Sequence, residues 1–301
     1  MSILEKKVTG IEEGIKIREY LKREMGLSTR LIRSASIDRR IFVNDIAVKM
    51  NRVLNEGEII KIDLAKDESQ DITPEKMDIE IIYEDEDILV VNKKPFMVVH
   101  PTKSYQSGTL ANGVINYFQE SGQKCIVRLV SRLDMNTSGL IIIAKNQFSH
   151  GMLSKEMSGN KVTKKYMAVV HGLLEKEEGT INLPIYRPEG TDFGIMRVVD
   201  ERGQRSITHY RVVEKYEDAS LVECTLETGR THQIRVHLSS IGHPIYGDSL
   251  YGNGDEEQDL INRQALHAYS LDFKSPRTGE ILSLKSELPE DMKSLIEKLN
   301  K

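Results

Sequence analysis

Positive charge is concentrated in one short segment near the start of the chain. Residues 14–52 contain ten Lys or Arg side chains and four Asp or Glu, a net charge of +6. The whole chain carries −4, so the other residues together carry −10 (−4 minus +6). A basic module joined to an acidic body is typical of a polyanion-binding attachment. A solvated helical face would show the same charge, so charge alone leaves both interpretations open.

The basic segment also shows a pattern of secondary structure. Apolar residues recur at helical spacing around Ile17 and Leu21 and again around Leu31 and Ala35, and Ser28 is placed to cap the second helix. The elements predicted after these helices are strands at 41–43, 46–48 and 59–64, with a turn at Asn44-Asp45.

A polar stretch separates this segment from the rest of the chain. Residues 66–76 are mostly polar and contain Pro74, which is typical of a linker. The length of 301 residues suits two domains at roughly 150 residues each. We therefore predict domains at 14–65 and 77–301.

The body mixes strands and helices without a strict βαβ repeat. This pattern predicts an α+β fold with a mixed, largely antiparallel sheet and flanking helices. Strands are expected within 77–91 and at 97–99, 126–130, 140–144, 166–170 and 221–226. Helices are expected at 108–119, 149–157, 231–241 and 288–301. Pro289 is expected in the first turn of the last of these helices.

Several classes of protein are disfavoured. The chain contains no GxGxxG, GxxxxGK[ST] or GxSxG motif, so no phosphate-binding loop or hydrolase nucleophile elbow is indicated. Its two cysteines, Cys125 and Cys224, form no CxxC pair, which disfavours a disulfide scaffold or structural zinc site and suits a reducing cytoplasm. The apolar run at 140–144 is far shorter than the 18 or more residues of a membrane span, and no secretory signal is expected.

Two segments carry candidate chemistry. In "RLDMNTSGLIIIAKN" (132–146), Asp134 and a Thr-Ser-Gly turn directly precede an apolar strand, and such a turn can offer backbone N–H groups. An Asp in this place can equally be an Asx-turn cap. In "LETGRTHQIRVHLSSIGHPIYGD" (226–248), Thr231 is placed to cap a helix that Gly242 ends. Arg235 on this helix can pair with a carboxylate, and with Arg230 it can bind phosphate.

Three histidines of the second segment invite a different interpretation. His232, His237 and His243 are separated by four and five residues, without the glutamate of HExxH. A metal site at these residues is one hypothesis, and histidines satisfied by other protein groups are the alternative.

The basic segment resembles the alpha-L RNA-binding domain. The similarity covers residues 17–62 and includes a basic second helix, the "IFVND" hairpin and the "NEGEIIKI" strand. It implies structured RNA as the partner, recognised by shape and phosphate contacts.

The body resembles the RluA-type family of RNA pseudouridine synthases. The blocks that carry the resemblance appear in the family's order. They are "ILVVNKKPFMVVHP" (88–101), "RLDMNTSGLIIIAK" (132–145), "KKYMAVVHG" (164–172), "TGRTHQIRVHL" (228–238) with "GHPIYGDSLYG" (242–252), and "LHAYSLDFKSPRTGE" (266–280).

The resemblance implies roles for particular residues. Asp134 would be the catalytic carboxylate and Arg235 its partner. Tyr166 and Ile234 would pack on the flipped uracil, and Arg132 would enter the RNA stack. The family usually has His where this chain has Ser131, which bears on substrate choice or rate rather than on the nucleophile. Further substrate contacts are expected at Thr137, Arg230 and His232, and RNA contacts at Arg30, Arg33, Arg39 and Arg40.

The implied reaction isomerises uridine to pseudouridine without a cofactor or metal. Large-subunit ribosomal RNA is the expected substrate, transfer RNA is the alternative, and the protein is expected to be a cytoplasmic monomer. Asp134 would act as nucleophile or as base, and the sequence does not choose between these. Two rival functions are a non-catalytic RNA-binding or ribosome assembly protein and a metal-dependent hydrolase built on the three histidines.

Overall fold

The structure is a computed structural model that describes residues 2–10, 14–66, 68–190 and 194–300. Within these ranges the strands form a four-stranded sheet near the N-terminus, a ten-stranded sheet in the body, and a separate two-stranded ribbon. None of the helices in the described ranges combines the length and apolarity needed to cross a bilayer.

The N-terminal part confirms the predicted helices and hairpin. The Ser28 hydroxyl caps the second helix by accepting from the backbone N–H of Leu31 at 3.2 Å. Asn44 and Asp45 both have positive φ, 48° and 64°, as a tight two-residue hairpin turn requires. The sheet has the order β1-β4-β2-β3, and β1 is an addition to the prediction. The elements are β1 (Ile3–Lys7), α1 (Ile17–Arg23), α2 (Thr29–Ile37), β2 (Ile41–Val43), β3 (Ile46–Ala47) and β4 (Ile59–Asp63).

The body confirms the predicted α+β fold. Its sheet has the order β10-β13-β14-β9-β15-β8-β6-β5, with β16 beside β15 and β7 beside β8. Every pairing in it is antiparallel except β8 with β15. The strands are β5 (Glu80–Glu84), β6 (Ile88–Lys93), β7 (Arg128–Leu129), β8 (Ser138–Ala144), β9 (Thr163–His171), β10 (Glu178–Asn182), β13 (Ile207–Lys215), β14 (Ala219–Leu226), β15 (Leu266–Lys274) and β16 (Ile281–Lys285); β11 (Ile185–Tyr186) and β12 (Val198–Val199) form the ribbon.

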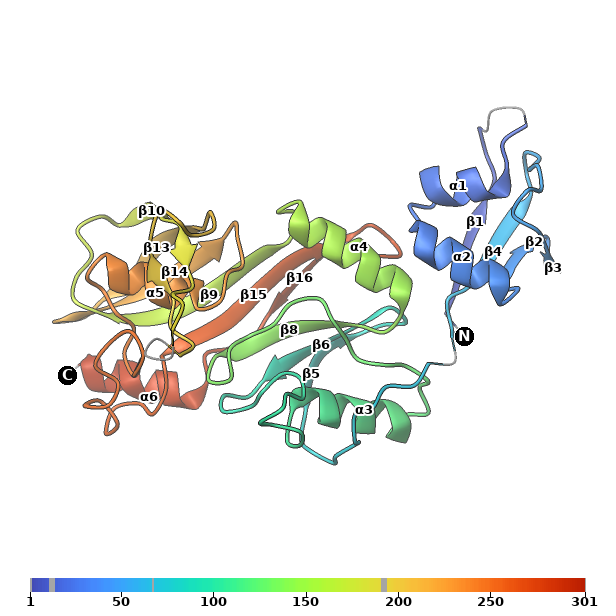
Figure 1. The fold of residues 1–301 in the computed structure, drawn as a ribbon. Coiled ribbons are helices and arrows are strands. Elements are labelled where there is room, and N and C mark those ends of the chain that lie inside the picture. Colours follow the sequence, from blue (N-terminus) through green and yellow to red (C-terminus); the bar gives the residue numbers. More distant parts are fainter. Residues whose placement is uncertain (1, 11–13, 67, 191–193, 301) are drawn as a thin grey trace.

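Helices cover both faces of this sheet. Alternate residues of β6 point to opposite faces, so Leu89 and Val91 pack with α3 while Ile88 and Val90 pack with α4. These two helices accordingly lie on opposite sides of β6 and β8 (Figure 1). At the other end of the sheet α5 contacts β13, and α6 lies near the C-terminus. The helices are α3 (Leu110–Glu120), α4 (Gln147–Ser158), α5 (Gln233–Ser240) and α6 (Glu290–Leu299).

Two local predictions for the body are wrong. Residues 97–99 do not form a strand, because they follow a turn at Phe96 (φ 60°) and their carbonyls bond to Lys93 and to the start of α3. Val98 and Val99 accept the backbone N–H groups of Leu110 and Ala111 at 2.9 and 3.0 Å, so this segment supports the start of that helix. Pro289 is the N-cap of α6 rather than a residue of its first turn.

The polar stretch between the two parts has no helix or strand in its described residues, but it is tied to the body. Gln70 exchanges two hydrogen bonds with the backbone of Val127, at 3.0 and 3.3 Å. Ile72 is buried in the cluster that contains α3, and the Thr73 carbonyl accepts from Asn112 at 2.8 Å. These contacts fix the path of the connection across the surface of the body.

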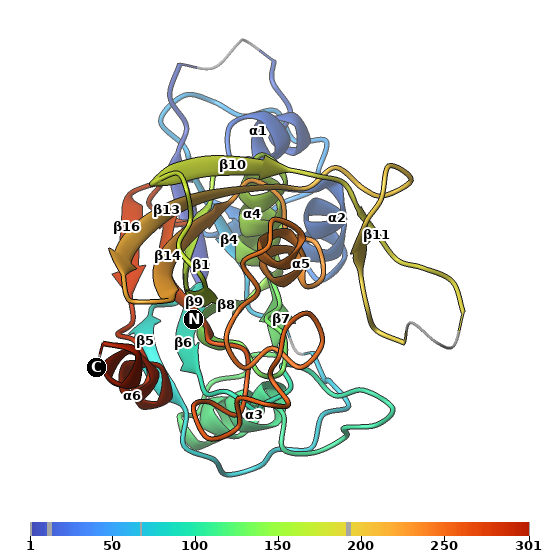
Figure 2. The same cartoon turned by 90° about the vertical axis from the view of Figure 1, so that its left-hand side faces the viewer.

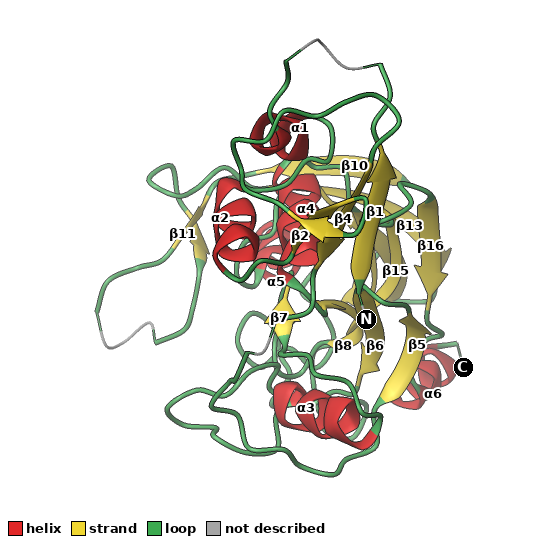
Figure 3. Ribbon diagram, turned by 90° about the vertical axis from the view of Figure 1, so that its right-hand side faces the viewer, coloured by secondary structure: helices red, strands yellow, loops and turns green. Residues whose placement is uncertain are grey.

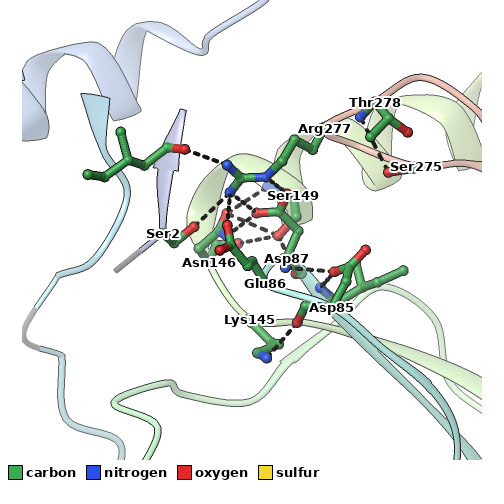
Figure 4. A network of polar contacts seen from close by, with 12 residues as sticks. Ser2, Asp85, Glu86, Asp87, Lys145, Asn146, Ser149, Ser275, Arg277 and Thr278 are labelled. Carbon is green, nitrogen blue, oxygen red and sulfur yellow. Dashed lines mark hydrogen bonds and ion pairs between the residues drawn. The ribbon is translucent and has the colours of Figure 1, made fainter. Parts of the chain in front are cut away.

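The N-terminal part contacts the body through α4 and Arg277. Phe148, near the start of α4, is buried within the core of the N-terminal part, and Met152 packs beside it. Arg277 donates to Asp87 at 2.8 and 3.1 Å, to the Ser2 hydroxyl at 2.9 Å, and to the Ile3 carbonyl (Figure 4). Asp87 is 1% exposed. The guanidinium therefore joins a buried carboxylate of the body to β1 of the N-terminal part.

We predict that Arg277→Ala lowers the free energy of unfolding by about 3 kcal/mol, because it leaves the buried Asp87 carboxylate without its cation. Urea denaturation would measure this loss. Arg23→Ala is the control, since Arg23 pairs with Glu19 while both side chains are largely exposed, and it should cost less than about 1 kcal/mol. Equal losses in the two variants would contradict the structural role of Arg277.

Candidate active site

Asp134 lies on the loop that joins β7 to β8. The backbone N–H of Thr137 donates to the backbone carbonyl of Asp134 at 3.1 Å, which closes a turn. Among the described residues no backbone N–H donates to the Asp134 carboxylate, so this turn is a main-chain turn and not the Asx-turn of the alternative. The Asp134 side chain is 29% exposed, and the buried Thr137 hydroxyl accepts from Gln264 at 3.2 Å.

The Thr-Ser-Gly turn is not the open nest of N–H groups that the sequence suggested. Ser138 and Gly139 already belong to β8 and pair with His267 and Ala268 of β15. Gly139 has φ 113°, and a Cβ on it would lie 2.3 Å from the Ala268 carbonyl oxygen. Glycine is needed there because β15 approaches too closely for a side chain.

Two buried basic side chains support the Asp134 loop, and no sequence pattern singled out either of them. Lys93 donates to the carbonyls of Met135, Met97 and Lys94 at 2.9 to 3.1 Å. Arg263 donates to the Asn136 carbonyl at 3.1 Å and forms an ion pair with Asp291 at 2.6 Å. Burial, reinforced by the charge of Arg263 and opposed by that of Asp134, lowers the pKa of Lys93 to about 7.

Arg235, on α5, contacts two carboxylates. Its Nη1 lies 3.4 Å from Asp134 Oδ2, which is the predicted pairing. Its Nε and Nη2 bind the two oxygens of Asp248 at 2.7 and 2.8 Å, and Asp248 is fully buried. Burial alone would lower the pKa of Arg235, but the hydrogen bonds and charge of Asp248 and the charge of Asp134 raise it. Asp248 ends the "GHPIYGD" block, and nothing in the sequence pattern indicated this role.

His232 stands at the start of α5 in a left-handed conformation, φ 57°. His232, and not the predicted Thr231, is therefore the N-cap residue, and its side chain makes no capping bond. Its Nδ1 lies 2.9 Å from the Tyr251 hydroxyl and its Nε2 lies 3.9 Å from Asp134 Oδ2. Burial lowers its pKa, so the imidazole is largely neutral at neutral pH. The Arg235 guanidinium lies over the Tyr251 ring at 5.1 Å.

The three histidines have separate partners. His237 lies 2.9 Å from both the Thr208 hydroxyl and the Leu183 carbonyl. His243 lies 2.9 Å from the His171 carbonyl. In the ranges that the structure describes, no group of three or more potential ligands is placed to hold a metal ion. The hydrolase hypothesis therefore has no support from this geometry.

The remaining expected contacts divide into buried and exposed residues. Tyr166, on β9, is 7% exposed, and burial together with the charge of Asp134 raises its pKa, so its hydroxyl stays protonated. Ile234 on α5 is buried. Arg132, two residues before Asp134, is exposed, and so is Arg230, whose N–H donates to Gln233 at 3.1 Å.

The four N-terminal arginines lie in the other part of the chain and do not join this site. Arg30 and Arg33, on α2, are exposed, as is Arg39 just after it. Arg40 instead donates to the Asp63 carbonyl at 2.6 Å and pairs with Asp38, and its side chain is only 12% exposed.

Comparisons with known proteins agree on one family. Residues 87–240 match the family model described as RNA pseudouridylate synthase. The uncharacterized RNA pseudouridine synthase YlyB of Bacillus subtilis is 45% identical, covering 88% of this chain and 87% of that protein. Ribosomal large subunit pseudouridine synthase D of Zymomonas mobilis is 38% identical, covering 75% of this chain and 74% of that protein.

A solved structure shows the same fold. Human RNA pseudouridylate synthase domain containing 1 superposes with a TM-score of 0.59 at 26% identity, covering 74% of this chain and 94% of that one.

We predict unequal stability losses for the two carboxylates that Arg235 contacts. Asp248→Asn should lower the free energy of unfolding by about 3 kcal/mol, because it removes one partner of a buried ion pair. Asp134→Asn should cost less than about 1 kcal/mol, since Arg235 keeps Asp248 and the Asp134 side chain is partly solvated. Chemical denaturation of both variants measures the difference, and a larger loss in Asp134→Asn would contradict this arrangement.

Proposed function

Since the chain belongs to the RluA-type family of RNA pseudouridine synthases, we propose that it isomerises specific uridines of large-subunit ribosomal RNA, with Asp134 as the catalytic carboxylate. The enzyme is an isomerase that acts on RNA. The ribosomal substrate is supported by relatives that carry the name ribosomal large subunit pseudouridine synthase D. The role of Asp134 is supported by its position, partly solvated beside the only guanidinium that contacts it among the described residues.

The reaction rearranges one nucleoside without adding or removing atoms. The bond between N1 of uracil and C1′ of ribose breaks, the base turns, and C5 bonds to C1′. C5 loses its proton and N1 gains one. Because no oxidation or group transfer occurs, we expect no cofactor.

Asp134 has the geometry for the first step. Its contacts with Arg235 and His232 go to Oδ2, which leaves Oδ1 for the substrate. Asp134 attacks C1′ as a nucleophile or removes a proton from C2′ as a base, and both routes use the ionised carboxylate. Arg235, itself fixed by Asp248, keeps the carboxylate oriented.

The neighbouring side chains suit an everted nucleotide. Extruding a uridine from an RNA helix costs roughly a few kcal/mol, and the exposed Arg132 is placed to occupy the vacated stack. Tyr166 and Ile234 provide apolar walls for the uracil. The remaining substrate contacts that we assign are His232, whose imidazole is neutral, Thr137 and Arg230.

We further propose that residues 14–65 form an alpha-L RNA-binding domain, linked through 66–76 to a catalytic domain at 77–301. The four-stranded sheet of the N-terminal part, which also includes β1, is not continuous with the sheet of the body and supports this division. Arg30, Arg33 and Arg39 are exposed and available for phosphate contacts, whereas Arg40 mainly holds the domain together. The partner is structured RNA, and a monomer acting in the cytoplasm suits this role.

We predict that Asp134→Asn lowers pseudouridine formation by at least about a thousandfold, because it removes the group that reacts with the sugar. The substrate is unmodified RNA carrying tritium at C5 of uridine, from which the reaction releases tritium. Large-subunit ribosomal RNA and transfer RNA transcripts are tested in parallel.

Folding and RNA affinity of Asp134→Asn should remain close to wild type, which separates a chemical role from a structural one. Wild-type rates in the variant would refute the assignment. Modification of transfer RNA alone would refute the ribosomal substrate, and binding without any product in the wild type would favour an assembly protein.

The N-terminal domain is tested through its salt dependence. Arg30→Gln combined with Arg33→Gln should weaken RNA binding and reduce the slope of log affinity against log salt concentration by about two units, one for each phosphate that the variant no longer neutralises. A matched control removes Lys274 and Lys285, two exposed lysines on β15 and β16. If both double variants show the same slope, α2 is not the RNA-binding face.

A further inference from the structure

A cavity lined by arginines lies beside the start of α5. Its volume is about 480 Å³, and its wall includes Arg187, Arg197, Arg202 and Arg230. The β11–β12 ribbon and the residues that follow it form one side, and the segment that leads into His232 forms the other. No acidic side chain stands among the described residues of the wall. Asp200 pairs with Arg202 at 2.7 Å and neutralises one charge of the four.

This concentration of charge is unusual within its surroundings. The chain outside residues 14–52 carries a net charge of −10. Because Asp200 neutralises only Arg202, the other guanidinium groups of the wall repel one another, which costs stability unless an anion occupies the space. A contribution to solubility therefore does not explain why the arginines are grouped around this cavity.

Several close contacts order the walls of the cavity. The Arg202 guanidinium lies over the Tyr186 ring at 4.5 Å. Ile185 and Gln204 exchange two backbone hydrogen bonds at 2.9 Å. Between them, Gly203 approaches so closely that a Cβ on it would lie 2.4 Å from the Ile185 carbonyl carbon. These contacts hold Arg187 and Arg202 on one short ribbon.

The cavity is also connected to the Asp134 site. The backbone N–H of Arg197 donates to the Tyr251 hydroxyl at 2.8 Å. The same hydroxyl bonds to His232, whose other nitrogen faces Asp134. Arg230 is only two residues from His232 in the chain. A strand of RNA that delivers a nucleotide to Asp134 would therefore pass close to these arginines.

We propose that this cavity binds a backbone phosphate of the RNA strand, on a nucleotide next to the one everted toward Asp134. The inference rests on the proposed function and adds a specific anchoring site to it. Arginine suits this task because its planar guanidinium donates two parallel hydrogen bonds to phosphate oxygens. In Figures 2 and 3 β11 projects on the same side as α2, while Figure 1 shows α2 and α5 toward opposite ends of the molecule.

The test combines Arg187→Gln with Arg202→Gln, two exposed arginines of the ribbon that take no part in the Asp134 site. The control is the Lys274→Gln and Lys285→Gln variant, which removes the same charge from β15 and β16; in Figure 2 β16 lies on the opposite side from β11. The probe is the tritiated large-subunit ribosomal RNA transcript. Measured quantities are kcat, KM and the RNA dissociation constant over a range of salt concentrations.

A phosphate anchor contributes equally to substrate and transition state, so it affects KM and not kcat. We expect KM and the dissociation constant to rise at least about tenfold, as removal of a charged hydrogen bond implies. The salt slope should fall by about one unit, because a single phosphate is no longer neutralised, and kcat at saturating RNA should stay unchanged. In the control variant kcat, KM and the dissociation constant should each stay within about twofold of the wild-type values.

Other results would overturn the inference. Unchanged KM and salt slope in the arginine variant, with an active wild type, would show that the cavity does not hold RNA. A fall in kcat alone would indicate a role in chemistry instead of anchoring. Titration with inorganic phosphate tests whether the cavity binds a free anion instead of RNA. If the arginine variant loses phosphate binding but keeps its RNA affinity, the cavity binds a free anion.

Failure of the proposed function would look different. A wild type that binds the transcript but releases no tritium contradicts the isomerase assignment for that RNA. The dissociation constant and its salt slope still report on the cavity in that case. The two results are therefore read from separate measurements.

Discussion

The buried ion pair between Arg235 and Asp248 is the contact on which the active site depends. Two nitrogens of the guanidinium bind Asp248, which fixes the plane and direction of the group and leaves Nη1 facing Asp134. A charge that is buried without a partner is costly, so Asp248 makes it possible to keep a permanent cation next to Asp134, the carboxylate that we propose as catalytic. Asp134 can then remain partly solvated and open to a substrate, because it is not needed to neutralise Arg235.

The Asp134 loop is held from several directions by parts of the chain that are distant in sequence. Lys93 at the end of β6 and Arg263 just before β15 each donate to backbone carbonyls of the loop. The parallel contact of β8 with β15 brings these elements together, and Gly139 permits the close approach. The position of one carboxylate thus follows from packing across the middle of the sheet, which gives a preorganised site with little freedom to move.

The same sheet positions the surfaces that surround the site. Phe148 of α4 enters the N-terminal core while Leu153 of the same helix packs on the body, so α4 couples the two parts. On the other side of α5, the β11–β12 ribbon carries its arginines close to His232. For an enzyme that must recognise a structured RNA, fixed spacing between phosphate contacts and the reactive group provides selectivity that contacts at the base alone do not supply.

The sequence by itself determined the local elements and the family. The basic segment, the Ser28 cap and the Asn44-Asp45 turn depend on near neighbours in the chain, so their patterns are directly readable. The motif blocks also identified Asp134 and its pairing with Arg235 through resemblance. Periodicity did not reveal the central strand β15, because a strand that is buried on both faces lacks a clear alternation.

Only the tertiary structure decided which groups share Arg235, what supports the Asp134 loop, and where the arginines of the cavity meet. Asp248, Lys93 and Arg263 belong to separate segments whose proximity is set by strand order and not by spacing along the chain. The conformation of His232 and the use of main-chain atoms in the Asp134 turn were likewise set by packing. Long-range contacts of this kind carry no periodic signal, because the folded sheet alone brings those residues within hydrogen-bonding distance.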